Sequence, residues 1–220
     1  MQTILFDLDG TLLDHFTTIH KCVAYAQRRL GLPEAGYDDV RSVVGGSVSR
    51  TLEQLVGSER VEAALHLFRE HFEAIKFDDV FALPGAHHIL GNLKARGHQL
   101  AVLTNKYGDD ARATVAHLGM SGYFDVVAGA GDTTHRKPAP AFTQYALDQL
   151  HAKAEDSLLI GDSPYDFATA ENAGLPVYLL STGTHSREEL EQSTGCRHIF
   201  ANLRELGEAI FEIPCEHART

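Results

Sequence analysis

Short apolar runs alternate with longer amphipathic stretches along most of the chain. Turn-forming residues bound each run, and a helix-length segment separates it from the next. Runs of this kind are typical of buried parallel strands, because a strand covered on both faces carries apolar side chains throughout. The predicted strands are Thr3–Phe6, Gln99–Thr104, Phe124–Ala128, Leu158–Gly161 and Val177–Leu180.

Three of the segments between these runs have the apolar spacing of covering helices. We predict that these helices begin near Gly85, at Asp109 or Asp110, and after Pro138. Gly97 and Gly119 are predicted to end the first two, since glycine is the common residue after a helix. Strands that alternate with helices in this way predict an α/β fold with a Rossmann-like parallel sheet core.

The pattern changes between Asp14 and Leu83. No strong strand is visible there, and the amphipathic stretches are Thr17–Leu30, Val48–Leu55 and Arg60–Ile75. We therefore predict an inserted α-helical cap over residues 15–82. The α/β core is then discontinuous and comprises residues 1–14 and 83–220.

Composition excludes some classes of partner. The 220 residues include 44% hydrophobic side chains and carry a formal net charge of −11. This charge argues against nucleic acid or an anionic membrane as a partner, because both need clustered Lys and Arg. No segment approaches the ~20 apolar residues of a membrane span.

Cysteine use and the amino terminus bear on the compartment. Cys22, Cys196 and Cys215 are too few and too scattered for a disulfide framework, which favours a reducing cytosol. The chain begins with a strand-like run and lacks the basic and apolar regions of a signal peptide. We expect a cytoplasmic protein that is a monomer or a homodimer.

Two acidic residues follow the first apolar run. Side chains two positions apart share one face of a strand, so Asp7 and Asp9 would point to the same side. This edge of a parallel sheet is where α/β proteins hold ligands. The alternative is an ordinary turn, since Asp and Gly are common turn formers.

Three further motifs favour a functional site over a turn. They are Val102-Leu103-Thr104-Asn105-Lys106, Arg136-Lys137-Pro138-Ala139-Pro140 and Ile160-Gly161-Asp162-Ser163-Pro164-Tyr165-Asp166. If they converge with the first motif, Asp7, Asp9 and Asp162 offer the hard oxygen ligands that suit Mg²⁺. Asp166 could orient the loop or a metal-bound water. No His or Cys cluster accompanies them, which argues against Zn²⁺.

The same convergence would allow phosphate chemistry. A carboxylate that attacks a phosphate dianion meets like-charge repulsion, which Mg²⁺ and the Lys137 ammonium would offset. The Thr104 hydroxyl and the backbone N–H groups near Asn105 could bind phosphate oxygens at a strand-to-helix turn. A solvent-exposed lysine is the alternative for Lys137.

Taken together, these motifs resemble the haloacid dehalogenase superfamily, in the capped branch of phosphoglycolate phosphatase and its relatives. The resemblance covers essentially the whole chain. It implies that Asp7 is the nucleophile that forms an aspartyl-phosphate, and that Asp9 is the general acid and base. It also implies that Thr104 and Lys137 bind phosphate. Asp162 and the backbone carbonyl of Asp9 would bind Mg²⁺, with Asp166 in support.

The resemblance implies hydrolysis of a small phosphorylated metabolite, with two alternatives. Dehalogenases of the superfamily lack an acid at the position of Asp9, which favours phosphate chemistry here. A capped mutase resembling β-phosphoglucomutase shares the core residues, but Arg50 does not fit the mutase pattern and is predicted to be a surface residue. A catalytically silent phosphate-binding or regulatory member is the second alternative, although Asp7, Asp9, Lys137 and Asp162 are all present.

Overall fold

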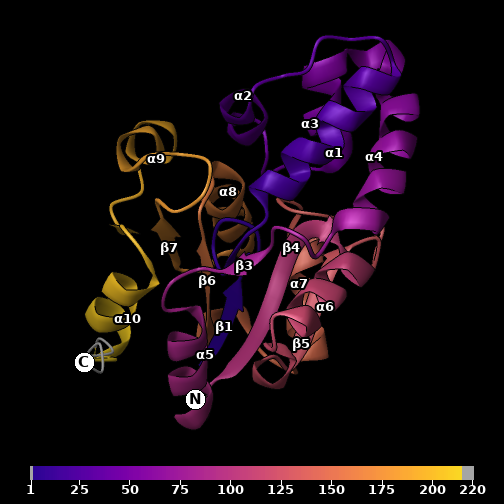
Figure 1. Cartoon of the computed structure of the whole chain (residues 1–220). Coiled ribbons are helices and arrows are strands. Elements are labelled where there is room, and N and C mark those ends of the chain that lie inside the picture. Colours follow the sequence, from indigo (N-terminus) through magenta and orange to yellow (C-terminus); the bar gives the residue numbers. More distant parts are fainter. Residues whose placement is uncertain (1, 215–220) are drawn as a thin grey trace, which may run out of the picture.

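A six-stranded sheet forms the centre of the computed structural model, which describes residues 2–214. All neighbouring strands pair in parallel, in the order β5-β4-β1-β6-β7-β8 (Figure 1). The predicted α/β fold with a parallel sheet is therefore confirmed. The strands are β1 (Thr3–Phe6), β4 (Gln99–Tyr107), β5 (Val126–Ala130), β6 (Ser157–Gly161), β7 (Val177–Leu180) and β8 (Ile199–Phe200).

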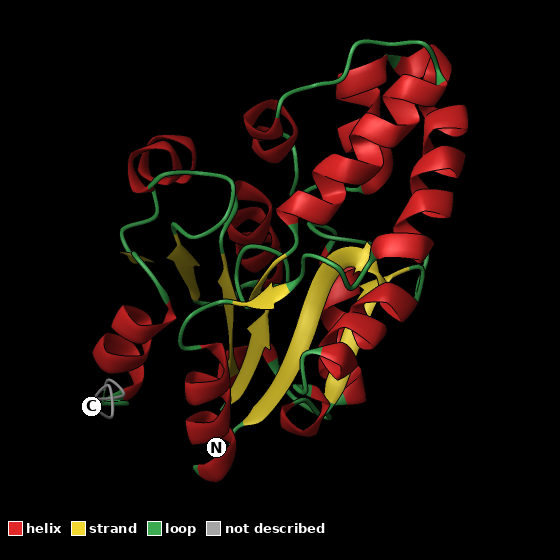
Figure 2. Ribbon diagram, in the orientation of Figure 1, coloured by secondary structure: helices red, strands yellow, loops and turns green. Residues whose placement is uncertain are grey.

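Helices cover both faces of this sheet, as the ribbon in Figure 2 shows. Side chains alternate along each strand, so Ile4 and Phe6 pack on one face and Leu5 packs on the other. The first face is covered by α5 (Ala86–Ala95), α6 (Gly108–His117) and α10 (Leu203–Phe211). The second face is covered by α7 (Pro140–Gln149) and α8 (Pro164–Ala173), while α9 (Arg187–Thr194) packs near β7 and β8.

Four α-helices lie between Asp14 and Phe81 in sequence and form a separate layer. They are α1 (Phe16–Arg29), α2 (Tyr37–Ser42), α3 (Val48–Val56) and α4 (Val61–Ile75). Leu52 and Phe68 belong to their own apolar core, distinct from the two cores of the sheet. We call this layer the cap; it lies over the carboxyl ends of β1 and β4 (Figure 1). The inserted helical region is therefore confirmed, whereas the domain bounds 15–82 stay a prediction.

A small antiparallel pair connects the cap to the core. β2 (Leu13–Asp14) pairs with β3 (Phe81–Ala82), and the Leu83 amide donates to the carbonyl of Leu12 at 2.9 Å. The expectation of helices alone between Asp14 and Leu83 was wrong here. Strands of two residues carry no readable alternation, so only their pairing identifies them. The cap adds no strand to the central sheet.

The bounds of the other elements differ from prediction in informative places. β1 and β7 match residue for residue, but β5 begins at Val126 and not at Phe124. β4 continues past Thr104 through polar residues, because its end pairs with β5 across a shift of register at Tyr107. The sequence analysis did not identify α2, α8, α9, α10 or β8.

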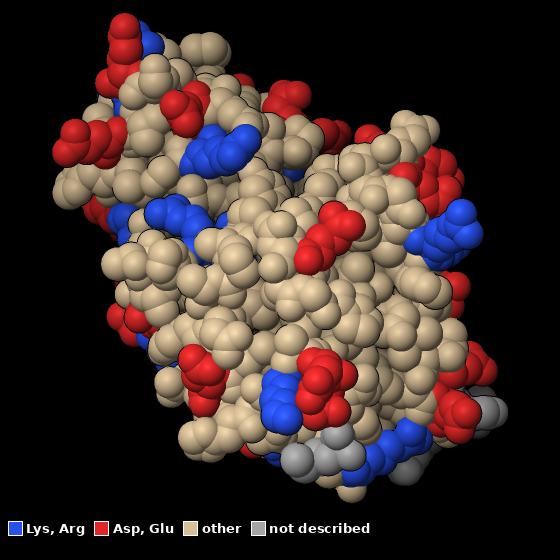
Figure 3. Space-filling model, turned by 180° about the vertical axis from the view of Figure 1, so that it is seen from behind, with Lys and Arg blue, Asp and Glu red and all other residues tan. Residues whose placement is uncertain are grey.

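No helix in residues 2–214 is long and apolar enough to cross a membrane. On the face drawn in Figure 3, acidic and basic side chains are scattered among uncharged ones. Cys22 and Cys196 are buried and free, and Cys215 lies outside the described residues. Cytoplasmic location and a monomer or homodimer remain predictions.

Candidate active site

Asp7 follows β1 directly and lies at the carboxyl edge of the sheet. Its side chain is buried, and Oδ1 lies 2.8 Å from Nζ of Lys137. Oδ1 has no hydrogen bond of good geometry, so charge attraction alone engages this atom. Burial raises the pKa of Asp7 to about 6, despite the opposing charge of Lys137. The carboxylate is therefore mostly ionised at neutral pH and keeps an oxygen available.

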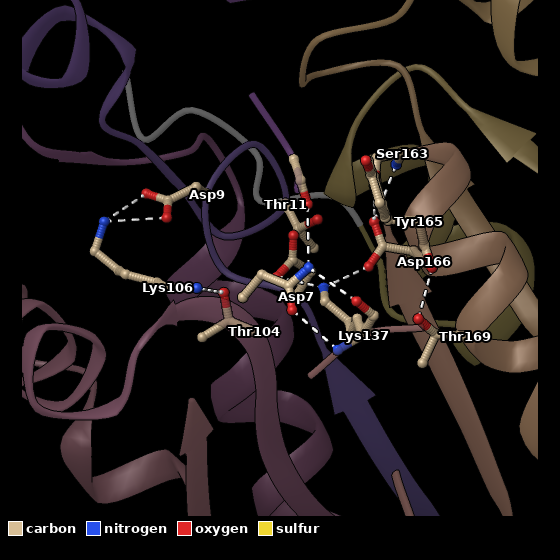
Figure 4. A network of polar contacts seen from close by, with 12 residues as sticks. Asp7, Asp9, Thr11, Thr104, Lys106, Lys137, Ser163, Tyr165, Asp166 and Thr169 are labelled. Carbon is tan, nitrogen blue, oxygen red and sulfur yellow. Dashed lines mark hydrogen bonds and ion pairs between the residues drawn. The ribbon is translucent and has the colours of Figure 1, made fainter. Parts of the chain in front are cut away.

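Lys137 is a buried cation between two carboxylates (Figure 4). Besides Asp7, its ammonium donates to Oδ1 of Asp166 at 2.7 Å. Burial opposes the charge, but Asp166 and Asp7 together raise the pKa of Lys137 above its usual value. The loop that carries Lys137 is held by Asn105, whose side-chain oxygen accepts from the Lys137 amide at 2.9 Å. The exposed lysine considered above is therefore wrong.

Asp166 has a different environment from Asp162. It lies in the first turn of α8, where its Oδ2 accepts from the Ser163 hydroxyl at 2.6 Å and from the amides of Ser163 and Asp162 at 3.1 and 3.2 Å. Asp162, which follows β6, accepts from the Thr11 hydroxyl at 2.8 Å. Burial, reinforced by Asp166 and Asp7, raises the pKa of Asp162 well above its usual value. Asp166 is thus occupied by donors, whereas Asp162 retains free acceptor capacity.

The three buried acids fit a divalent cation. Carboxylate oxygens of Asp7, Asp162 and Asp166 lie within 4.8 Å of one another. Lys137 is the cation that pairs with two of them, so negative charge is in excess. Burial first, and then the neighbouring acids, raise the pKa values of Asp7 and Asp162. Oxygen donors that carry excess negative charge suit Mg²⁺. This cluster indicates a metal site.

Asp9 points away from Asp7, toward Lys106 (Figure 4). Its carboxylate oxygens lie 3.0 and 3.1 Å from Nζ of Lys106, and Nδ1 of His15 lies 3.7 Å from Oδ1. His15 is held from its other side, where Nε2 contacts the Lys76 carbonyl at 2.8 Å. Burial and the charge of Lys106 lower the pKa of His15 to about 4. His15 is therefore neutral at physiological pH, and Lys106 is the cation that fixes Asp9.

Thr104 and Asn105 lie at the end of β4 and line the same cavity as Asp7. The Thr104 hydroxyl is buried and accepts from the Lys106 amide at 3.2 Å. The Asn105 side chain is occupied by the Lys137 backbone and, at 3.4 Å, by the carbonyl of Gly45. The four motifs thus converge, although Asn105 offers this cavity its backbone more than its side chain.

Polar contacts hold the cap against the core above this site. A guanidinium nitrogen of Arg41 donates to the carbonyl of Gly183 at 2.5 Å, and Arg69 pairs with Asp110 at 3.1 Å. Arg50 is exposed, as predicted, and its guanidinium lies over the ring of Tyr165. The cap is therefore closed over the carboxyl edge of the sheet.

Sequence reasoning missed several residues of the site. His15, six positions after Asp9, and Lys106, from the distant end of β4, both contact Asp9, and Gly183 packs on Asp162. A Cβ at Gly183 would stand 1.6 Å from Oδ2 of Asp162, so only glycine fits there. The one available signal was Lys106, which directly follows a predicted phosphate-binding pair. Neither His15 nor Gly183 has a local pattern that marks it.

Comparison with known proteins identifies the family. The family model described as haloacid dehalogenase-like hydrolase matches residues 4–180. The chain belongs to this family. A phosphoglycolate phosphatase from Rhodospirillum rubrum is 33% identical over 94% of this chain and 90% of its own length. One from Aquifex aeolicus is 32% identical over 83% of this chain and 86% of its own.

Other relatives have different names. The pyrophosphatase PpaX of Halalkalibacterium halodurans is 26% identical over 87% of this chain and 89% of its own. A crystal structure described as a predicted phosphatase from Clostridium acetobutylicum superimposes with a TM-score of 0.88 at 28% identity, covering 96% of this chain and 98% of that one. The protein is therefore a haloacid dehalogenase-family phosphatase.

Proposed function

We propose that this phosphatase is a Mg²⁺-dependent phosphomonoester hydrolase, phosphoglycolate phosphatase-like in reaction, that works through an aspartyl-phosphate on Asp7. The observation that carries the proposal is the buried Asp7 carboxylate, which faces the cavity and has the Lys137 ammonium 2.8 Å away. An anionic oxygen beside a fixed cation suits attack on phosphorus. The substrate is a small phosphorylated metabolite.

The phosphate would be bound at the floor of the cavity. Lys137, the Thr104 hydroxyl and the backbone N–H groups near Asn105 are the donors for its oxygens. Asp7, Asp162 and the Asp9 backbone carbonyl would hold Mg²⁺, and Asp166 would support them through Lys137. When bound, Mg²⁺ supplies positive charge that offsets the repulsion between phosphate and carboxylate.

Asp9 is the proposed proton carrier. An oxygen of Asp7 bonds to phosphorus as the phosphorus–oxygen bond to the alcohol breaks, and Asp9 gives that alkoxide its proton. Asp9, now a carboxylate, accepts a proton from a water that attacks phosphorus, and the phosphorus–oxygen bond to Asp7 breaks. Inorganic phosphate leaves and Asp7 is regenerated. Asp9 and Lys106 both line the cavity, where their ion pair holds the Asp9 carboxyl.

The test measures phosphate release and the intermediate together. Wild type, with and without Mg²⁺, receives 2-phosphoglycolate or pyrophosphate, and acid-quenched samples are digested for mass spectrometry. We expect Mg²⁺-dependent phosphate release. In Asp9→Asn we expect a phosphoryl group that accumulates on the Asp7 peptide, because water is no longer activated.

Asp79→Asn is the matched control, since Asp79 pairs with Lys21 on the surface. It should behave as wild type. Absence of Mg²⁺-dependent phosphate release from every phosphate ester tried would contradict the proposal. So would faster formation of glucose 6-phosphate than of phosphate, from β-glucose 1-phosphate with a trace of the bisphosphate, because that is the activity of a mutase.

A further inference from the structure

The cavity above Asp7 has two unlike sides. Its volume is about 70 Å³, and it lies between the cap and the carboxyl edge of the sheet. Its floor is polar and includes Asp7, Thr104 and Lys106. The cap side is apolar, and we call it the cap wall: Phe16, Ile19, Val44, Val48, Phe68 and Phe72. A phosphate bound at the floor would therefore direct its leaving group toward the cap wall.

Polar side chains that the cap contributes to this cavity are already engaged. The Thr51 hydroxyl donates to the Val43 carbonyl at 3.1 Å. Arg69 pairs with Asp110 at 3.1 Å, and its guanidinium lies 4.1 Å from the centre of the Tyr107 ring. Among the described residues that line the cavity, Thr51 and Arg69 are the polar side chains of the cap, and each already has a partner. The other polar groups of the cap there are the remaining N–H groups of Arg69 and the backbone of Gly45 and Gly46.

This arrangement discriminates by desolvation. Hydroxyl groups of a sugar would lose their water against the cap wall without a replacement donor or acceptor, which is unfavourable. A carboxylate would lose its water against the same wall, beside an Arg69 that is already paired with Asp110. Methylene or aryl groups lose only unfavourable contact with water. Burial of each methylene contributes about 0.8 kcal/mol to the binding free energy, or roughly fourfold in affinity.

We propose that the substrate is a phosphate monoester whose alcohol carries an apolar body, aryl or branched alkyl, that packs on the cap wall. The inference rests on the proposed phosphomonoester hydrolysis and adds the class of leaving group. It distinguishes this chain from an enzyme that selects sugar phosphates or a small hydroxy-acid phosphate.

The test compares phosphate esters of primary alcohols, so that the reacting oxygen is alike throughout. Benzyl phosphate and 3-methylbutyl phosphate are the apolar pair; glucose 6-phosphate and 2-phosphoglycolate are the polar pair. We expect kcat/KM for each apolar ester to exceed that for each polar ester by about tenfold or more. Phosphate release that Asp7→Asn abolishes, with a polar ester preferred, would overturn this inference and leave the hydrolase intact. Release from none of the four would overturn both.

A shape-matched variant tests the wall itself. Val44→Thr places a hydroxyl in the cap wall at constant volume, and Val48→Thr repeats this on α3. Each should reduce the preference for benzyl phosphate over glucose 6-phosphate by about threefold to tenfold. Val61→Thr, outside this cavity on α4, is the control and should leave the preference unchanged. An unchanged preference in both wall variants would contradict contact between leaving group and wall.

Discussion

The floor and the roof of the active-site cavity are built differently. Asp7 and Asp162 line the floor, and Lys137 and Asp166 lie buried beside them, joined by charged contacts and hydrogen bonds of 2.7 to 2.8 Å. The roof is the cap wall, attached to the core by a few polar contacts such as Asn105 to Gly45 at 3.4 Å. Fixed charges suit a chemical step that is the same for every substrate. The residues of the roof, in contrast, can differ between enzymes that act on different substrates.

The contrast also concerns stability. Buried acids in excess over their cations destabilise a fold, because burial disfavours charge. The floor therefore opposes folding where it favours chemistry, and the roof stabilises by ordinary packing. Substitutions at the floor should change activity by orders of magnitude and raise or lower stability, whereas those at the roof should mainly alter selectivity.

The largest effect is expected from Asp7→Asn. We expect kcat to fall by about 1,000-fold or more, because the amide lacks the attacking charge. Without Mg²⁺ and above pH 6, we also expect the variant to be more stable than wild type by about 1–3 kcal/mol, since a raised pKa means that folding disfavours the charge. Steady-state kinetics and urea unfolding measure both.

The pH dependence of the free energy of unfolding tests the sign of the Asp7 contribution. The folded state retains the Asp7 proton up to about pH 6, whereas the unfolded chain releases it near 3.8, so this contribution to stability is lost as pH rises through that window. His15 acts in the opposite direction. Its pKa is about 4 in the folded state and 6.5 in the unfolded chain, so its contribution makes stability rise with pH between these values. Subtracting the Asp7→Asn profile from wild type isolates Asp7. A flat difference from pH 4 to 7 would contradict the raised pKa.

The next effect is expected at a glycine. In Gly183→Ala the new Cβ would overlap Oδ2 of Asp162, so that carboxylate must move. We expect the Mg²⁺ concentration for half-maximal activity to rise about tenfold to 100-fold. Gly122→Ala, where a Cβ meets no atom within 4 Å, is the control. An unchanged Mg²⁺ requirement in Gly183→Ala would argue against Asp162 as a ligand.

Lys106→Met tests how Asp9 is held. Loss of the ammonium removes the 3.0 Å ion pair and leaves Asp9 without its fixed orientation. We expect kcat to fall about tenfold for alkyl phosphates and less for aryl phosphates, whose better leaving groups depend less on a general acid. Lys94→Met, which breaks a surface pair with Asp125, is the control. Equal losses for both substrate classes would show a role other than Asp9 positioning.

The smallest effect is expected at the roof. Arg41→Ala removes the donor to Gly183 and one attachment of the cap. Arg41 also donates to the Thr182 carbonyl at 3.4 Å, and its guanidinium lies over the Phe16 ring. We expect KM to rise about threefold, while the free energy of unfolding falls by about 1 kcal/mol, because these contacts are few and partly exposed. Thermal unfolding measures the change in stability, and steady-state kinetics with one substrate measure KM and kcat. A loss of kcat above tenfold would mean that the roof takes part in the chemistry.

Local sequence determined the parts of this protein that depend on near neighbours. β1 and β7 were predictable because buried strands need unbroken apolar runs, and Asp7 and Asp9 because strand ends hold ligands. The switch from alternating elements to helices alone marked the cap, and four motifs in order identified the family. None of these inferences required a distance between remote segments.

Tertiary structure alone decided the contacts between remote segments. Lys106 is 97 positions from Asp9, and the loop at Gly183 reaches Asp162 only because β6 and β7 are neighbours. β2 and β3 have two residues each and are defined by pairing, not by pattern. The apolar cap wall likewise appears in sequence as ordinary helix packing. Its position over Asp7 follows from how the closed cap contacts the core, which no local period encodes.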